Sequence, residues 1–445
     1  MADASTSNGF VETEIGLLPS DWQVCKLGDC CTLATGGTPS RAVAEYWNGG
    51  IPWVKTGEIT YTTITETEEF ISQQGLDNSA AKIYPTGTLL VAMYGQGVTR
   101  GRAGILGIDA AINQACAAIT VSEKIRSDFL FYALKAHYER IRELGHGANQ
   151  RNLNMQLLRG VEVPVPPIEE QRAIAGVLRT VQRAKEATET VIAAVGQLKQ
   201  SLMRHLFTYG PVPFQQADHV ELQETRFGDA PANWETQLLD DCCVVQTGVA
   251  KGRKFGDDET VDLPYLRVAN VQGGYLDLSE IKQITIRKRE IDRYSLQDGD
   301  VVLTEGGDFD KLGRGFIWRN EIPGCLHQNH VFAVRADRRR LMPEFVAHQT
   351  QSDYGRAYFL SVAHRTTNLA CINTTKLKAF PMLIPPLPVQ QEITATLEVI
   401  DRKLAEEDKK GQAMARLFDS LLHDLMTGQR RVHELGLEFT VEETA

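Results

Sequence analysis

The chain has 445 residues, of which 42% are hydrophobic and 23% charged, and its formal net charge is −10. This length is too great for one ordinary hydrophobic core and predicts two or three domains, while the composition is that of a globular protein. No apolar run reaches the roughly 18 to 20 residues that span a bilayer, and the first residues lack the basic and apolar regions of a signal peptide. None of the eight cysteines stands in a CxxC pair, so we expect a cytoplasmic protein without a zinc site.

The negative charge is concentrated in three stretches. Residues 1–21 and residues 432–445 each carry four acidic residues and no Lys or Arg, and residues 212–241 carry seven acidic residues and one Arg. The rest of the chain therefore has a net charge of +4. This balance permits a surface that faces phosphate groups, although it does not demonstrate one.

The sequence contains an internal duplication. DWQVCKLGDCC, from Asp21, matches NWETQLLDDCC, from Asn233, at an offset of 212 residues. The same offset relates IPWVKTGEI, from Ile51, to LPYLRVANV, from Leu263. Nearer the end of each copy the offset is 219, where LNMQLLRGVEVPVPP matches INTTKLKAFPMLIPP. A constant register followed by one change is the pattern of two copies with one net insertion.

Each copy begins with short apolar runs between glycines, such as GTLLVAMYG and GDVVLTEGG, which predict strands. A helix-like patch follows in each copy, at residues 127–144 and 342–360. We therefore expect an α+β domain of ordinary size in each copy.

Each copy ends in a predicted long helix that starts after a proline pair, because proline is tolerated only in the first turn of a helix. Apolar residues then alternate at spacings of three and four, which is the heptad pattern of paired helices. About 38 residues at roughly 1.5 Å each would make a helix about 57 Å long. The polar EEDKKGQ stretch around Gly411 is expected to interrupt the second seam. The residues expected to pair the helices are Ile174, Val177, Val181, Ala184, Thr188, Val191, Val195, Leu198 and Leu202 in the first helix and Leu397, Ile400, Leu404, Met414, Leu417, Leu421 and Leu425 in the second.

The predicted fold class is α+β, with two tandem globular α/β-mixed domains separated by two long helices that pair as an antiparallel coiled coil, in a pseudo-twofold internal repeat. The predicted order along the chain is an acidic tail (1–14), the first domain (15–165), the first long helix (166–210), a linker (211–227), the second domain (228–384), the second long helix (385–430) and a second acidic tail (431–445).

Motifs for catalysis are absent from the sequence. It has no GxxxxGK[ST] phosphate loop, no HExxH pair, no GxSxG elbow and no [DN]PP[YF] tetrapeptide. His327 and His330 are three residues apart, but no third His is clustered with them in the sequence, so we predict no metal site. The GQGVTRGRAG loop lacks the following helix and acidic partner of a dinucleotide site.

Basic and amide-bearing residues occur instead in glycine-rich loops of both copies. Arg and Lys match guanine edges or phosphates, Asn and Gln match adenine, and Gly lets the backbone approach a partner. Solvated loops are the plain alternative for any one residue, but the recurrence in both copies favours DNA contacts. The predicted DNA-binding residues are Thr38, Arg41, Lys55, Gln96, Arg100, Arg102, Asn149, Gln150, Arg151 and Asn152 in the first copy and Lys251, Arg253, Lys254, Arg267, Lys311, Arg314, Arg365, Thr366, Thr367 and Asn368 in the second.

The sequence resembles the specificity subunits of Type I DNA restriction-modification systems. The resemblance rests on LPSDWQVCKLGD, IPWVKTGEI, NLNMQLLRGVEVPVPPIEEQRAIAGVL and their partners in the second copy, and it covers essentially the whole chain. The second copy departs from the pattern, with APANW in place of LPSDW and PPLPVQQ in place of PPIEEQ.

The resemblance implies that each α+β domain is a target recognition domain for one half of a split double-stranded DNA sequence. The paired helices would set the number of unread base pairs. Two modification subunits, which use S-adenosylmethionine to methylate adenine, and restriction subunits, which use ATP and Mg, would bind this chain. The chain itself would bind no cofactor, would not contact a membrane and would have no catalysis. A coiled-coil scaffold that binds no nucleic acid and a divergent DNA-modifying enzyme remain the alternatives.

Overall fold

The computed structural model describes residues 9–95, 98–145, 152–307, 312–365 and 370–436. The chain forms two compact units. Unit 1 comprises residues 1–188 and 410–445, and unit 2 comprises residues 189–409. Each unit therefore combines one copy of the α+β repeat with parts of both long helices.

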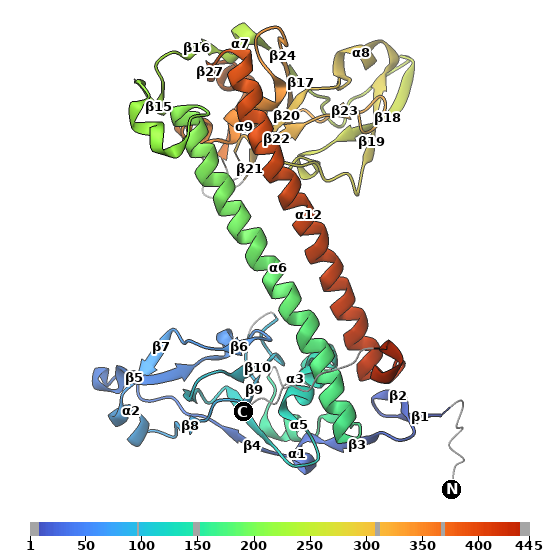
Figure 1. Cartoon of the computed structure of the whole chain (residues 1–445). Coiled ribbons are helices and arrows are strands. Elements are labelled where there is room, and N and C mark those ends of the chain that lie inside the picture. The colour runs from blue at the N-terminus through green and yellow to red at the C-terminus, as the bar shows by residue number, and fades with distance from the viewer. Residues whose placement is uncertain (1–8, 96–97, 146–151, 308–311, 366–369, 437–445) are drawn as a thin grey trace. The chain divides into compact units, whose positions relative to one another are not determined.

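Unit 1 contains a five-stranded sheet in the order β4-β12-β9-β10-β6 and a four-stranded sheet in the order β7-β5-β11-β8 (Figure 1). The apolar run between glycines that predicted a strand forms β9, whose four residues are all buried. The helices α3 (Ser127–Ala136) and α4 (Tyr138–Glu143) follow the last strand. The strands are β4 (Cys31–Thr35), β5 (Trp47–Val54), β6 (Thr63–Ile64), β7 (Glu69–Ile71), β8 (Ile83–Tyr84), β9 (Leu89–Ala92), β10 (Ala103–Leu106), β11 (Ala110–Ile112) and β12 (Cys116–Val121).

Unit 2 repeats this architecture with a four-stranded sheet in the order β17-β24-β20-β22 and a three-stranded sheet in the order β19-β18-β23. The helices α9 (Pro343–Gln351) and α10 (Asp353–Val362) follow the last of these strands. Since two sheets followed by a pair of helices recur in the same order in both units, with two strands fewer in the sheets of unit 2, the structure confirms the predicted α+β duplication. The strands are β17 (Cys243–Thr247), β18 (Thr260–Leu266), β19 (Lys282–Arg287), β20 (Val301–Thr304), β22 (Gly315–Ile317), β23 (Leu326–His327) and β24 (Val331–Ala336).

Smaller elements join these parts. They are α1 (Leu27–Cys30), α2 (Gln73–Asp77), α5 (Met155–Arg159), α7 (Leu239–Cys242), α8 (Ile291–Tyr294), α11 (Thr374–Lys378), β1 (Phe10–Thr13), β2 (Gly16–Pro19), β3 (Gln23–Lys26), β13 (Glu162–Val165), β14 (Leu222–Thr225), β15 (Gly228–Pro231), β16 (Glu235–Leu238), β21 (Gly306–Gly307), β25 (His364–Arg365), β26 (Ala370–Cys371) and β27 (Pro381–Ile384). The segment 211–227, which we expected to be a linker, contains β14, and β14 pairs with β15 just as β1 pairs with β2.

A glycine at the same place in each copy lets two backbone segments touch. A Cβ atom on Gly36 would lie 1.8 Å from the carbonyl oxygen of Ile112, and one on Gly248 would lie 2.0 Å from that of His327. Any side chain would therefore force these segments apart. The turn after β4 and the turn after β17 need glycine for this reason, and the two glycines keep the 212-residue offset.

The proline pairs precede two long helices, α6 (Ile168–Tyr209, 42 residues) and α12 (Leu387–Met426, 40 residues). A glutamine in the first turn of each helix, Gln171 or Gln390, is 0% exposed. The Gln171 amide donates to the carbonyl oxygens of Pro166 (2.8 Å) and Lys124 (3.0 Å) and accepts from the Arg126 N–H (2.9 Å). The recurring PP-x-x-x-Q pattern therefore connects the start of the helix to the chain just before α3.

Gln390 makes the same set of hydrogen bonds in unit 2. Its amide donates to the carbonyl oxygens of Pro385 (2.8 Å) and Arg340 (2.8 Å) and accepts from the Met342 N–H (2.8 Å). These residues lie just before α9, which corresponds to α3 of unit 1. The second helix is thus attached to its own domain in the same way as the first.

The two long helices pack against each other in both units. In unit 1, Ile174 and Leu178 of α6 share one core with Phe418, Leu421 and Leu425 of α12. In unit 2, residues from the end of α6, such as Leu206, share a core with Ile393 and Leu397 from the start of α12. The beginning of each helix therefore packs with the end of the other, which confirms the predicted antiparallel pairing.

The seam of α6 follows the prediction at six of its nine positions. Ile174, Val177, Val181, Thr188, Val195 and Leu202 are buried or half-buried. Ala184 is exposed, and Val191 and Leu198 are 39% and 55% exposed, so these three do not occupy covered positions. The covered positions beside them are Lys185, Ile192 and Lys199, one residue later in each case. Lys199 is ion-paired with Asp401 at 2.5 Å. This ion pair compensates the charge of a lysine at a partly covered position.

The helix α12 is continuous through residues 406–412. The covered positions of this polar stretch are Glu407 and Gly411, so the apolar seam is interrupted there as predicted. Glu407 is buried with an ion pair to Lys403 at 2.6 Å. Leu417 is 45% exposed, whereas the next residue, Phe418, is buried. The remaining predicted positions are buried or half-buried, namely Leu397, Ile400, Leu404, Met414, Leu421 and Leu425.

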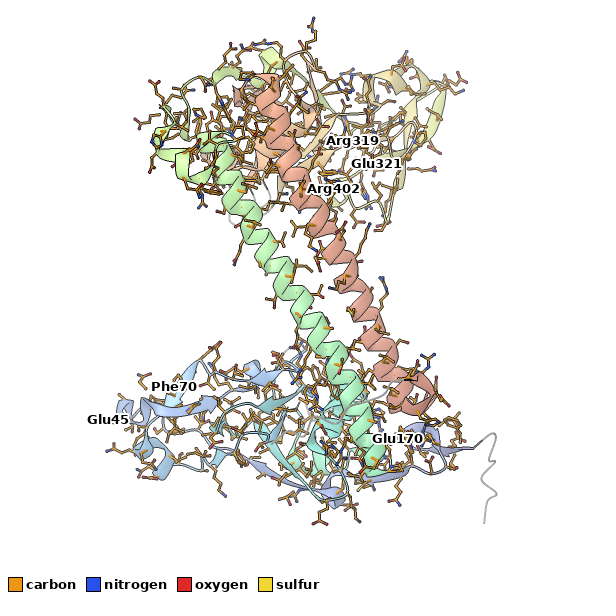
Figure 2. All side chains as sticks on the ribbon, in the orientation of Figure 1. Glu45, Phe70, Glu170, Arg319, Glu321 and Arg402 are labelled. Carbon is orange, nitrogen blue, oxygen red and sulfur yellow. The ribbon has the colours of Figure 1, made fainter. Side chains whose placement is uncertain are left out.

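Arg431, which follows α12, closes unit 1. Its guanidinium pairs with Asp21 of the LPSDW motif (2.8 and 3.0 Å) and with Glu170 at the start of α6 (2.5 and 2.7 Å; Glu170 is labelled in Figure 2). The Trp22 indole N–H donates to the same Glu170 carboxylate at 3.1 Å. The motif near the beginning of the chain is therefore held by the end of the second long helix.

We predict that Gln171→Leu and Gln390→Leu each lower the free energy of unfolding by about 2–4 kcal/mol, because each removes a fully buried amide that makes three hydrogen bonds to the backbone. Urea denaturation followed by circular dichroism measures this change. Gln391→Leu is the matched control, since Gln391 is the exposed neighbour of Gln390, and it should have little effect. Equal stability of the Gln390 and Gln391 variants would contradict the assigned role.

Candidate nucleic-acid interface

A hollow of about 560 Å³ in unit 1 brings together three of the predicted DNA-binding residues, Thr38, Arg41 and Lys55. The Thr38 hydroxyl donates to the amide oxygen of Gln114. The hollow lies where β5 ends and the turn after β4 passes. Its lining is Thr38, Arg41, Trp53, Lys55, Thr56, Gly57, Glu58, Glu68 and Asn113.

Lys55 is positioned by a short 3₁₀ turn, Thr56–Glu58, directly after β5. Its backbone N–H donates to the Glu58 carboxylate at 2.6 Å. Its ammonium group pairs with Glu68 and Glu69, both at 2.9 Å. The hydrogen bond to Glu68, and after it the one to Glu69, raises the pKa of Lys55 above its ordinary value. Lys55 therefore carries its charge at neutral pH, but two carboxylates neutralise it.

Arg41 shares the Glu69 carboxylate with Lys55. Its guanidinium lies 2.5 Å from Glu69 and 3.6 Å from the ring centroid of Trp47. Arg41 first, and then Lys55, lowers the pKa of Glu69 by hydrogen bonding. The side chain of Arg41 is 56% exposed, so its ion pair is weak, and the stacking on Trp47 helps to hold its direction.

Unit 2 has the same arrangement at the same offset. Arg267 follows β18 as Lys55 follows β5, and its backbone N–H donates to the Asn270 side chain at 2.8 Å in the 3₁₀ turn Val268–Asn270. Its guanidinium pairs with Glu280 at 3.1 Å and lowers the pKa of that carboxylate. Since 212 residues separate Lys55 from Arg267 and also Glu68 from Glu280, the cation and its carboxylate recur as a pair.

Arg253 of unit 2 corresponds to Arg41. Its guanidinium donates to both carboxylate oxygens of Glu290, at 2.7 and 2.9 Å, and lowers the pKa of Glu290. Two more predicted residues lie nearby along the chain and are exposed, Lys251 and Lys254. The ammonium of Lys251 lies 5.9 Å from the ring centroid of Tyr265.

Among the predicted residues of the glycine-rich loops that the structure describes, Arg100 is buried. Its side chain is 8% exposed and donates to the carbonyl oxygen of Gly145 at 3.4 Å. This burial favours a role in the fold, and the expected DNA contact of Arg100 stays a prediction. Arg102 and Arg314, which correspond at the 212 offset, are half-buried, and Asn152 is exposed.

Other predicted residues lie outside the described part of the chain. Arg365 falls in β25, but its side chain is not described. The remaining ones, which stay predictions, are Gln96, Asn149, Gln150, Arg151, Lys311, Thr366, Thr367 and Asn368.

The sequence analysis missed the acidic partners of these cations. The predicted DNA-binding residues included the lysines and arginines but not the glutamates that pair with them. These glutamates are Glu68, Glu69, Glu280 and Glu290. A signal was available, because Glu68 and Glu280 keep the register of the repeat. This recurrence of an acidic residue would have predicted the pairing from the sequence.

The two histidines considered as metal ligands have different environments. His327 is completely buried, and none of the described residues accepts or donates a hydrogen bond at either of its ring nitrogens. His330 hydrogen-bonds the Glu305 carboxylate through its Nδ1 atom. Within the described ranges, no three His, Cys, Asp or Glu side chains are grouped so that they could hold a metal ion.

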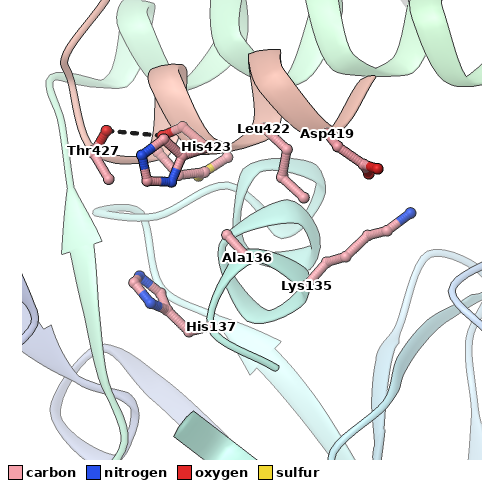
Figure 3. A pocket seen from close by; sticks show the side chains of 8 residues that line it. Lys135, Ala136, His137, Asp419, Leu422, His423 and Thr427 are labelled. Carbon is pink, nitrogen blue, oxygen red and sulfur yellow. Dashed lines mark hydrogen bonds between the residues drawn. The ribbon is translucent and has the colours of Figure 1, made fainter. Parts of the chain in front are cut away.

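A second cavity, of about 420 Å³, lies in unit 1 between the end of α3 and α12 (Figure 3). Lys135 on its wall lies with its ammonium 4.3 Å from the ring centroid of Phe418, and burial lowers the pKa of Lys135 to about 8. Asp419 and His423 of α12 face it across the cavity. None of the predicted DNA-binding residues lines this cavity.

Among the described residues, no helix combines the length and the apolar character that crossing a bilayer requires.

The sequence matches a known protein family. The model described as the Type I restriction modification DNA specificity domain matches residues 19–197 and 231–413. The chain is similar to the Type I restriction enzyme MjaIX specificity subunit of Methanocaldococcus jannaschii, with 25% identity over 96% of this chain and 97% of that protein. It is also similar to the EcoKI specificity subunit of Escherichia coli, with 23% identity over 86% of this chain and 82% of that protein.

The fold is shared with a solved structure, the S subunit of a Type-I restriction-modification system from M. genitalium. The TM-score is 0.57 with 17% identity, and the match covers 91% of this chain and 96% of that one. This likeness agrees with the duplicated architecture described above.

We predict that Arg100→Ala lowers the thermal unfolding midpoint by several degrees, because it removes a buried guanidinium that holds the Gly145 carbonyl. Arg41→Ala, at an exposed position, should leave the midpoint almost unchanged. Differential scanning calorimetry of the two variants makes the comparison. Equal midpoints would show that Arg100 does not stabilise the fold.

We also predict that stability falls on acidification from about pH 6.5 to pH 4. Burial lowers the pKa of His327 and of His348 to about 4. The folded state then resists protonation at a pH where the unfolded chain, with a histidine pKa near 6.5, already binds protons. Stability is therefore complete above this window and is lost as the pH decreases through it.

His327→Leu should reduce the difference in unfolding free energy between pH 7.5 and pH 5.0 by about 2 kcal/mol. His433→Leu is the control, because His433 is exposed. Urea denaturation at the two pH values measures both. An unchanged pH dependence in the His327 variant would contradict the burial argument.

Proposed function

This chain belongs to the family of the Type I restriction modification DNA specificity domain, and we propose that it reads a bipartite double-stranded DNA target, one half with each recognition domain. Its role is DNA sequence specificity in a Type I restriction-modification system. The observation that carries the bipartite reading is the recurrence of one cation–carboxylate arrangement, around Lys55 and around Arg267, in two domains of the same fold. Two similar readers on one chain suit two half-sites.

The chain acts as a recognition and assembly subunit without catalysis of its own. The absence of phosphate-loop, metalloprotease, hydrolase and methyltransferase motifs from the sequence supports this. Modification subunits with S-adenosylmethionine and restriction subunits with ATP and Mg supply the chemistry, and this chain binds none of these cofactors. We infer that the complex acts in the cytoplasm.

A selection from randomised duplex DNA tests this function. The complex with its modification subunits should retain duplexes that carry two specified segments separated by an unspecified spacer. Arg41→Ala should reduce sequence preference in one segment, and Arg253→Ala in the other, by about 1–3 kcal/mol where the arginine contacts a guanine. Quantitative sequencing of bound and unbound pools measures the preference.

The alternatives give different results in the same system. A scaffold that binds no DNA would show no sequence preference in any pool. An enzyme would transfer methyl groups from labelled S-adenosylmethionine, or cut DNA, as the purified chain alone. Loss of preference in both segments from either single variant would contradict the assignment of one domain to one half-site.

A further inference from the structure

The cations at the ends of β5 and β18 are not isolated positive charges. Lys55 pairs with Glu68 at 2.9 Å and Arg267 pairs with Glu280 at 3.1 Å. In both units the acidic residue lies 13 positions after the cation. Each pair has a further charged neighbour, because Lys55 also pairs with Glu69 at 2.9 Å and Glu280 with Lys282 at 3.4 Å. Each site therefore presents hydrogen-bond donors and acceptors side by side, with little net charge.

A neutral pair of this kind is poorly suited to the DNA backbone. Binding to a phosphate would require the cation to leave its carboxylate and would place that carboxylate close to another anion. Base edges in the major groove differ from phosphates, because they present donors and acceptors together. The pair is therefore better matched to a base pair than to the backbone.

The G·C pair fits the arrangement best. Guanine offers two acceptors, N7 and O6, to a cation, while the cytosine N4 amino group donates to a carboxylate. O6 and N4 are hydrogen-bonded to each other across the base pair, so they lie about 2.9 Å apart, which is close to the spacing of the protein atoms that would meet them. An A·T pair also places a donor beside an acceptor, but thymine offers the cation one acceptor next to a methyl group.

We propose that the Lys55–Glu68 pair reads one G·C base pair of the DNA target, with Lys55 donating to guanine and Glu68 accepting from cytosine. The Arg267–Glu280 pair reads a G·C base pair in the other half of the target in the same way. This inference rests on the proposed function, and it adds the identity of the base pair and the role of the two carboxylates.

The exposure of the side chains agrees with this role. Glu68 and Glu280 are 75% and 67% exposed, while the cations behind them are more covered. The carboxylates can therefore reach a partner outside the protein. Hydrogen bonding to Arg267 lowers the pKa of Glu280, so at neutral pH this carboxylate is ionised and acts only as an acceptor.

The experiment compares base preferences of the complex carrying wild-type chain, Glu68→Gln or Glu280→Gln in the randomised-duplex selection. Glutamine keeps the size of the side chain but replaces one acceptor oxygen with a donor. Glu68→Gln should reduce preference for G·C over the other pairs at one position of one half-site by about tenfold or more. Glu280→Gln should do the same in the other half-site only.

Glu66→Gln is the matched control, because Glu66 is an exposed glutamate two residues from Glu68 and its change removes the same charge. It should leave every base preference unaltered. The thermal midpoints of all three variants should equal that of the wild type, which shows that a changed preference does not arise from unfolding.

Three outcomes would overturn the inference. Glu68→Gln could increase affinity for all sequences alike, which would mean that the carboxylate only screens Lys55 from phosphates. It could leave all preferences unchanged, which would assign the pair to the fold. The affected position could prefer A·T in the wild type. Failure of the proposed function looks different, because the wild-type complex would then select no sequence at all.

Discussion

The first turn of each long helix contains a glutamine that water does not reach, and the direction of the helix relative to its domain depends on the three hydrogen bonds of that amide. Gln171 binds the chain before α3, and Gln390 binds the chain before α9. A buried amide is stable only when its donors and acceptors are satisfied. Because the partners are backbone groups at the same place in both copies, one local motif gives both units the same connection between domain and helix.

The duplication made most of the fold predictable, while the register of the helix seam was not. The 212-residue offset aligns whole strands, such as β5 and β18, so the fold of one copy implies that of the other. In α6 two apolar stripes run along the helix, and the exposed one contains Val191 and Leu198. A prediction from apolar residues chooses Leu198 for the helix seam. In the structure Lys199 occupies the covered position instead, where it forms an ion pair with Asp401. Only the packed partner helix decides between such stripes.

The candidate interface shows the same limit. The residue type alone identified arginines and lysines in glycine-rich loops as DNA-binding candidates. Only the structure shows that Arg100 is buried whereas Arg41 is exposed. The glycines beside Arg100 favoured a DNA contact in the sequence, whereas in the structure the guanidinium lies against Gly145, where a Cβ atom would be 3.3 Å from the Arg100 Nε atom. The acidic partners required the fold, because strand geometry brings Glu69 to both Arg41 and Lys55.

The electrostatics of the chain suggest how affinity and specificity are divided. The carboxylates next to Lys55 and Arg267 leave these two cations little attraction for phosphates. Non-specific affinity for DNA comes mainly from neutralised phosphates, whereas discrimination comes from base edges. Cations that are already paired with carboxylates add little to the non-specific affinity for DNA, but they can still contribute to the discrimination between sequences. Their carboxylates then favour the correct sequence by leaving an unpaired, desolvated acceptor against a base pair that offers no donor at that place, which costs more than a missing attraction.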